Sequence, residues 1–143
     1  MKVYCVQDSI VWENKLSNFK RVCCLIEKTK ILEDSLIVFP EMFATGFSLN
    51  ISVTSANEPH LTETFLTKLA KEKKCWVIAG LILPNKKENK ANNCAVTFDP
   101  NGKKISEYAK MHLIPMLGEN DTHVAGDKIE SFPIRDFQLT PAI

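Results

Sequence analysis

The sequence predicts an α/β fold in a single domain, and two features carry that prediction. At the start of the 143-residue chain, short apolar runs alternate with segments of helical periodicity, as they do in sheets built from βαβ units. In the middle, tight turns separate the apolar runs, which indicates antiparallel strands added to the same sheet. We expect helices to cover one face of this sheet and the other face to need a further partner.

The N-terminal part predicts a strand, a helix and a second strand. Residues 1–7 read as a buried strand. Apolar residues then recur at helical spacing from Asn14 to about Leu32. The run over residues 35–39 is short and continuously apolar, which is typical of a strand covered on both faces. The polar, irregular stretch over residues 50–58 predicts a surface loop.

The remaining elements follow in order along the chain. Pro59 suits the first turn of a second helix, whose apolar residues continue at helical spacing to about Lys74. Three strands joined by a charged hairpin loop and a tight turn come next. The strands cover residues 75–83, 94–98 and 105–108, the loop residues 84–89 and the turn residues 99–102. Residues 111–128 read mostly as loop, and the final pair of strands as residues 129–134 and 137–143.

Composition argues against several classes of function. A net charge of +1 gives no electrostatic reason to expect nucleic acid or an anionic membrane surface as a partner. No apolar run reaches the roughly 18 residues of a transmembrane helix, and the N-terminus turns polar too early for a signal peptide. The five cysteines form no C-x-x-C pair, so neither a disulfide framework nor a zinc site is indicated. Reduced thiols fit a cytoplasmic protein best.

Two charged residues stand where predicted strands end. Glu41 follows the apolar run that closes at Phe39, and Lys110 follows the one that closes at Tyr108. Open α/β sheets place their sites at the carboxyl ends of strands. A carboxylate in apolar surroundings is suited to accept a proton, and a lysine can hold an oxyanion or lower the pKa of a nearby thiol. The alternatives are a helix cap or surface salt bridge for Glu41 and a solvated side chain for Lys110.

Other reactive residues are weaker candidates. Glu119 could orient Lys110, although standing alone it reads as a loop carboxylate. His112 fits a structural, hydrogen-bonding histidine better than a ligand. We expect each cysteine to be a small buried hydrophobe, and none stands at a strand-to-helix elbow that would present a nucleophile. The cysteines are Cys5, Cys23, Cys24, Cys75 and Cys94.

Four segments of the chain form a recognisable pattern in their order and spacing. They are Val11-Trp12-Glu13-Asn14, the Val-Phe-Pro-Glu-Met-Phe-Ala-Thr-Gly-Phe stretch at 38–47, Asn93 with the turn at 99–102, and Tyr-Ala-Lys-Met-His-Leu at 108–113. Together they resemble the nitrilase superfamily of carbon–nitrogen hydrolases over essentially all of the chain. The segment around Trp12 and the stretch from Glu41 to Phe47 look closest to the bacterial amidase branch that includes the ω-amidases.

The resemblance implies an α-β-β-α sandwich and a Glu–Lys–Cys triad that needs no metal or organic cofactor. Glu41 matches the general base, and Lys110 matches the lysine that stabilises the oxyanion. Glu119 looks like a second glutamate that positions the lysine and the substrate, and Asn93 matches a recurring asparagine that we take to be structural. In the family, the strand resembling residues 137–143 leads directly into the nucleophilic cysteine.

Because that cysteine is not among the 143 residues, we expect residues 1–143 to be the N-terminal part of a single carbon–nitrogen hydrolase domain. The full-length protein would hydrolyse a small-molecule primary amide to a carboxylate and ammonia through a Cys thioester, as a cytoplasmic homo-oligomer, and the 143-residue chain alone would be inactive. Three alternatives remain open. They are a hydrolase acting on a carbamoyl or nitrile carbon or an acyl transferase of the same superfamily, a non-catalytic interaction module that kept the fold, and a small α/β binding domain.

Overall fold

The computed structural model describes residues 1–58, 60–85 and 88–143, and its centre is a five-stranded mixed sheet with the strand order β1-β2-β3-β4-β5. The first three strands are parallel, and β4 and β5 are added antiparallel at one edge. The strands are β1 (Val3–Cys5), β2 (Leu36–Val38), β3 (Trp76–Pro84), β4 (Ala91–Phe98) and β5 (Lys104–Ala109). This order confirms the α/β class and the predicted switch from parallel to antiparallel pairing.

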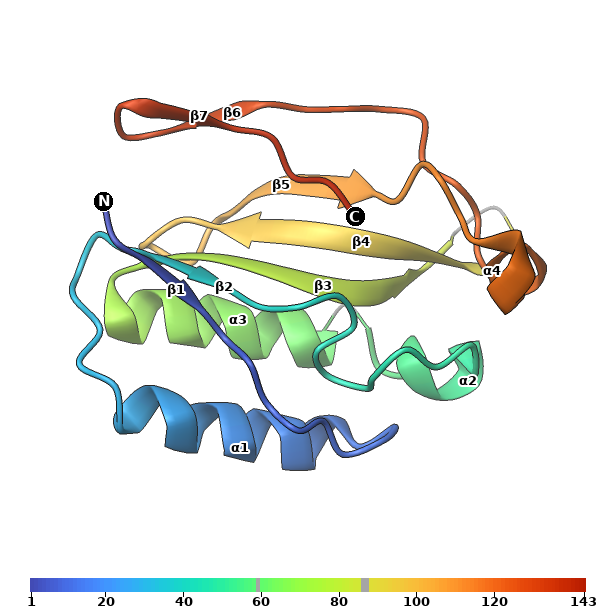
Figure 1. The fold of residues 1–143 in the computed structure, drawn as a ribbon, viewed down its shortest axis with the longest axis horizontal. Coiled ribbons are helices and arrows are strands. Elements are labelled where there is room, and N and C mark those ends of the chain that lie inside the picture. Colours follow the sequence, from blue (N-terminus) through green and yellow to red (C-terminus); the bar gives the residue numbers. More distant parts are fainter. Residues whose placement is uncertain (59, 86–87) are drawn as a thin grey trace.

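Two helices cover one face of the sheet, and a hairpin lies over the other (Figure 1). The helices are α1 (Lys15–Glu27) and α3 (His60–Lys73), and the hairpin is formed by β6 (Phe132–Ile134) and β7 (Phe137–Leu139). Ile134 of β6 is fully buried. The face that we expected to lack a partner is therefore covered in part by the chain's own last strands. No helix in the described part of the chain is long and apolar enough to span a membrane.

The hydrophobic core lies between the sheet and the two helices. Alternate residues of β3, including Val77 and Leu81, point toward the helices and are buried. From α1, Phe19 stacks on Phe65 of α3 with ring centroids 4.3 Å apart. Removing this apolar area from water is the main stabilising contribution to this layer.

Helix α1 begins as predicted but ends early. The side chain of Asn14 accepts a hydrogen bond from the Ser17 backbone N–H and caps the first turn. The helix ends at Glu27 rather than near Leu32. At that end the hydroxyl of Thr29 donates to the Leu25 carbonyl, a local bond that competes with continuation of the helix.

Several predicted boundaries are wrong. Strand β4 starts at Ala91, because its pairing with β3 runs on to Pro84, and the loop expected at 50–58 contains helix α2 (Ile51–Thr54). The loop expected at 111–128 contains a 3-10 turn, η1 (Pro115–Leu117), and helix α4 (Glu119–Thr122). Strands β6 and β7 are shorter than predicted, since among the described residues they pair with each other over three positions. Pro59 and residues 86–87 of the predicted hairpin loop lie outside the described residues.

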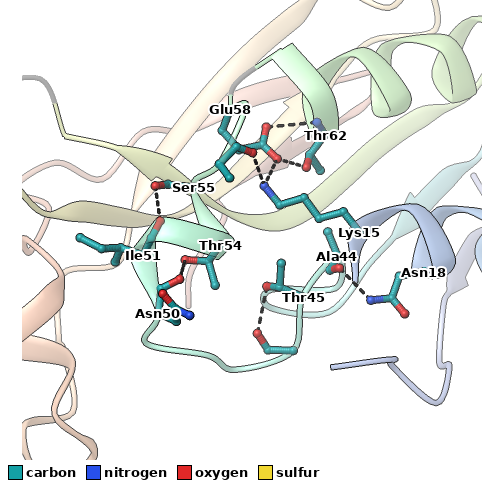
Figure 2. A network of polar contacts seen from close by, with 12 residues as sticks. Lys15, Asn18, Ala44, Thr45, Asn50, Ile51, Thr54, Ser55, Glu58 and Thr62 are labelled. Atoms are coloured by element: carbon teal, nitrogen blue, oxygen red, sulfur yellow. Dashed lines mark hydrogen bonds and ion pairs between the residues drawn. The ribbon is translucent and has the colours of Figure 1, made fainter. Parts of the chain in front are cut away.

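A buried polar network ties the start of α1 to the segment that follows β2 (Figure 2). The ammonium of Lys15 lies 2.9 Å from Glu58 Oε1 and donates to the Ala56 carbonyl at 2.7 Å. Glu58 also accepts from the backbone N–H and hydroxyl of Thr62, in the first turn of α3. The Asn18 amide donates to the Ala44 carbonyl at 2.7 Å. The loop after β2 is thus fixed from the helical side.

Candidate active site

Glu41 lies where the chain leaves β2 and turns over β3. The backbone N–H of Phe39 donates to the Ile78 carbonyl at 2.8 Å, which extends the pairing of β2 with β3 by one residue. Pro40 has no N–H and ends it. Met42 then adopts a left-handed conformation with φ of 50°, which is uncommon for a residue other than glycine. The sharp turn aims the Glu41 side chain toward β4 and β5.

The far end of this turn is held by the segment before α1. The Glu13 backbone N–H donates to the Thr45 carbonyl at 2.8 Å, and the Glu13 carboxylate accepts from the Ser48 hydroxyl at 2.5 Å. The Trp12 ring lies so close to Gly46 that a Cβ atom there would be 3.0 Å from it. Two of the segments that carry the sequence resemblance therefore pack against each other.

Lys110 lies directly after β5, beside Asn93 of β4. Its backbone N–H donates to the Asn93 carbonyl at 2.8 Å, and its carbonyl accepts from the Gly126 N–H at 2.9 Å. Both residues are buried, with 5% of Lys110 and none of Asn93 exposed. Strand β5 ends and β4 starts at the end of the sheet next to α4, and the segment after β2 runs toward that end (Figure 1).

Helix α4 supplies Glu119, which is fully buried. Its Oε2 accepts a hydrogen bond of 2.6 Å from the backbone N–H of Ile114. Its Oε1 lies 3.1 Å from the ammonium of Lys110. The carboxylate is therefore fixed at both oxygens.

The three residues singled out in the sequence meet around the Lys110 ammonium. Its Nζ lies 3.1 Å from Glu41 Oε1 and 3.1 Å from Glu119 Oε1. The Asn93 amide donates to the same Glu41 oxygen at 2.6 Å and to Glu119 Oε1 at 3.4 Å. The Glu41 side chain is 33% exposed, whereas that of Glu119 is fully buried. Of the two carboxylates, Glu41 is the one that an incoming molecule can reach.

Burial and pairing act in opposite directions on the protonation of this cluster. Burial would raise the pKa of Glu119, but hydrogen bonds from the Ile114 N–H and Lys110 outweigh it, so its pKa is lowered. Burial would lower the pKa of Lys110, but hydrogen bonds to Glu119 and Glu41 outweigh it, so its pKa is raised. Lys110 is therefore a permanent cation near neutral pH, held between two carboxylates.

A cavity of about 330 Å³ adjoins Glu41 on the face of the sheet away from the helices. Its walls are mostly apolar, as expected for the surroundings of Glu41, although the carboxylate itself bonds to Asn93 and Lys110. It is lined by Glu41, Val38, Phe39, Ile78, Gly80, Ala95, Ala142 and Ile143. The end of the described chain and the exposed carboxylate thus face the same space.

Some contacts around the cluster were not predicted from the sequence. Asn93, which we took to be structural, contacts both carboxylates through its amide. The ring of Phe47 lies 5.6 Å from Lys110 Nζ, within range of a cation–π contact. The structural histidine is not His112, which is exposed, but His123, which is 2% exposed. Burial lowers the pKa of His123.

Three of the cysteines contradict the expectation that all five are buried. The expectation that none of them is the nucleophile stays a prediction. Cys5, Cys23 and Cys24 are exposed rather than buried, because the faces of β1 and α1 that carry them point away from the core. Cys75 and Cys94 are buried as expected, and burial raises the pKa of Cys94 to about 12. No hydrogen bond in the described part of the chain joins a cysteine to the cluster around Lys110. No group of three or more His, Cys, Asp or Glu side chains among those residues could hold a metal ion.

A sequence profile of the carbon–nitrogen hydrolases matches residues 2–140. Among curated proteins, the chain is 31% identical over 138 residues to a Staphylococcus aureus protein named hydrolase in agr operon, covering 95% of this chain and 52% of that one. It is 28% identical over 149 residues to an omega-amidase of Yersinia enterocolitica, covering 100% of this chain and 54% of that one. The chain spans about half the length of the curated relatives it matches.

Solved structures give the same picture of the fold. A CN-hydrolase superfamily protein from Xanthomonas campestris superimposes with a TM-score of 0.86 at 21% identity, over 98% of this chain and 51% of that one. A nitrilase-superfamily protein from Saccharomyces cerevisiae superimposes with a TM-score of 0.82 at 26% identity, over 96% and 53% of the two chains. The α/β architecture described above is therefore that of about half of a nitrilase-type structure.

Proposed function

Because the chain belongs to the carbon–nitrogen hydrolase family, we propose that the full-length protein hydrolyses a small-molecule primary amide to a carboxylate and ammonia. The omega-amidase of Yersinia enterocolitica at 28% identity supports an ω-amide as the substrate class. The observation that carries the proposal is the position of the Lys110 ammonium, 3.1 Å from Glu41 and 3.1 Å from Glu119.

In this proposal the two carboxylates have different roles, which follow from their exposure. Glu41 is the general base, since its side chain is 33% exposed and borders the cavity. Glu119 is a positioning residue, because it is fully buried and bonded to Ile114 and Lys110. Lys110 stabilises negative charge on the reacting oxygen.

We propose that the nucleophile is a cysteine directly after Ile143, at the position that the family resemblance implies. Two observations support this placement. Ala142 and Ile143 line the same cavity as Glu41, so a side chain that follows them is close to the base. The five cysteines of the chain make no hydrogen bond to Glu41, Lys110 or Glu119 in its described part. The isolated 143-residue chain would then be inactive.

The proposed reaction proceeds in two halves. Glu41 takes the thiol proton, the sulfur forms a bond to the amide carbon, and the carbonyl electron pair moves to oxygen beside Lys110. Glu41 returns the proton to nitrogen, the C–N bond breaks, and ammonia leaves a thioester. Glu41 then takes a proton from water, the hydroxide attacks the thioester, the C–S bond breaks, and Glu41 returns the proton to the sulfur, which gives the carboxylic acid and the free thiol.

The proposal is tested by measuring ammonia release from a panel of glutaramate-type ω-amides, simple amides, nitriles and carbamoyl compounds. We expect the full-length protein to act on ω-amides and the Glu41→Gln variant to lose at least about 10²-fold in kcat. Circular dichroism of the variant checks that it is folded. Activity in the Glu41→Gln variant equal to that of the wild type would overturn the role of Glu41. Turnover of nitriles or carbamoyl compounds alone would overturn the amide assignment.

A further inference from the structure

We propose that Gly80 is a positioning residue for Glu41: the absence of a side chain at position 80 allows the turn after β2 to hold the carboxylate against Lys110. The consequence for turnover rests on the proposed function, whereas the consequence for the Lys110–Glu41 contact does not. Gly80 lies in β3 opposite Ala95 of β4. Its neighbours Ala79 and Leu81 face the helices, so Gly80 faces the opposite side, where it lines the cavity beside Glu41.

The turn after β2 rests directly on Gly80. A Cβ atom at position 80 would lie 2.5 Å from Glu41 Cα, 2.9 Å from Met42 N and 3.0 Å from the Pro40 carbonyl oxygen. All three are backbone atoms, so no side chain can rotate away to make room. The left-handed backbone at Met42 and the fixed φ of Pro40 leave the turn little freedom to adjust.

Any side chain at position 80 must therefore lift the turn. Ordinary van der Waals contacts begin at 3.4 Å, so relief of the 2.5 Å contact needs a shift of about 1 Å. Glu41 Oε1 now lies 2.6 Å from the Asn93 amide and 3.1 Å from Lys110 Nζ. A displacement of that size away from both partners would lengthen these contacts to about 3.5 Å and about 4 Å, at and beyond the limit of hydrogen bonding.

Gly102 provides a matched control at the other end of the sheet. It lies in the turn between β4 and β5, at the end of the sheet away from α4 (Figure 1). A Cβ atom there would lie 2.7 Å from Lys71 Cε and 2.8 Å from the Thr67 carbonyl oxygen, and its φ is +75°. Alanine at position 102 is therefore strained as well, but its nearest contacts are with Lys71 and Thr67 of α3 rather than with the turn that carries Glu41.

The test compares the Gly80→Ala and Gly102→Ala variants of the full-length protein. For each we would measure kcat and KM on the best amide, and the pKa of Lys110 by NMR of its 13C-labelled side chain. We expect Gly80→Ala to lower kcat by about 10²-fold with KM within about threefold. We also expect its Lys110 pKa to fall, since one carboxylate partner is lost. Gly102→Ala should lower the melting temperature and leave kcat and the Lys110 pKa unchanged.

Two results would overturn the proposal: a Gly80→Ala protein with wild-type kcat and Lys110 pKa, or equal losses of kcat in both variants. If Gly80→Ala does not fold, the Gly80→Ala/Pro40→Gly double variant gives the turn freedom to lift. We expect it to fold with kcat and the Lys110 pKa still low, and recovery of both would contradict the inference. If the wild-type protein releases no ammonia, the proposed function fails, and the NMR comparison still tests the positioning by Gly80.

Discussion

Glu119 and Lys110 form a buried ion pair, with 3.1 Å between Oε1 and Nζ and with 0% and 6% of the two side chains exposed. The same carboxylate accepts the Ile114 N–H on its other oxygen. Helix α4, which carries Glu119, and the strand end that carries Lys110 are thus joined by one charged group. Loss of Lys110 would leave the buried Glu119 carboxylate without its cation, and loss of Glu119 would leave Lys110 paired with Glu41 alone.

Replacing Glu119 by glutamine should be strongly destabilising. The amide keeps the shape of the side chain but leaves the buried Lys110 with Glu41 as its single carboxylate partner. We expect urea unfolding to show a loss of about 3–5 kcal/mol. Glu72→Gln is the matched control, because Glu72 pairs with Lys68 on the surface with 57% of its side chain exposed. That change should stay within about 0.5 kcal/mol. Equal losses in the two variants would contradict the account of Glu119.

Acidification should destabilise the protein first through His123. Burial lowers the pKa of this residue, so the folded state resists a proton that the unfolded chain accepts below about pH 6.5. The unfolding free energy therefore falls as the pH is lowered from 7 to 5. Chemical denaturation over this range should give a smaller slope for His123→Gln than for the wild type. Identical slopes would exclude His123 as the source.

Glu119 should contribute a second acid transition at lower pH. Its pKa is lowered in the folded state, so its stabilisation is complete above the ordinary carboxyl pKa of about 4.3 and is lost as the pH falls through the folded value. Denaturation curves between pH 5 and 3 should show this loss in the wild type. The Glu119→Gln variant carries no titrating group at that position and should be less sensitive to pH there.

The buried pair of Lys15 and Glu58 should be structural rather than catalytic. Lys15→Met leaves the Glu58 carboxylate buried beside Thr62, and we expect it to cost about 3–5 kcal/mol. Adding Glu58→Gln removes the unpaired charge and should recover part of that loss. Urea denaturation of the single and double variants measures both effects. A double variant less stable than Lys15→Met would show that the carboxylate contributes more than its pairing with Lys15.

The five cysteines should be dispensable for catalysis. Three of them are exposed on β1 and α1. Cys75 and Cys94 are buried in the core, and the Cys75 thiol contacts the backbone carbonyls of Leu32 and Lys73. A full-length protein with all five replaced by alanine should keep its kcat within a few-fold, although loss of the buried Cys94 should lower the melting temperature. Loss of turnover on replacement of any single one of them, with the fold retained, would overturn the proposed nucleophile.

The sequence was sufficient to single out the charged residues that meet around the Lys110 ammonium, but not their environment. Glu41 and Lys110 could be predicted because each follows an apolar strand, and strand ends gather at one edge of a sheet. The role of Asn93 could not, because only the register of β4 brings its amide to Glu41. The short helix α4 was missed for a similar reason: four residues give too little periodicity, and Glu119 is fixed there by a tertiary contact with Lys110.

The contact of Gly80 with the turn after β2 could not be predicted either. A glycine in a strand indicates a close approach of something, but the sequence does not say of what. Only the pairing of β2 with β3 places Glu41 Cα over Gly80. The exposure of Cys23 and Cys24 was misjudged because α1 packs on the sheet through Val22 and Ile26, and the adjacent cysteines fall on its outer face.

The most direct test of the central claim is peptide mass spectrometry of the full-length protein during inactivation by iodoacetamide. We predict that one equivalent of label attaches to a cysteine directly after Ile143 and that ammonia release is lost in parallel. Labelling at that position should be slower in the Glu41→Gln variant, because the thiol loses its base. A different residue after Ile143, or full activity once that thiol is labelled, would contradict the claim that Glu41 and Lys110 serve a cysteine nucleophile.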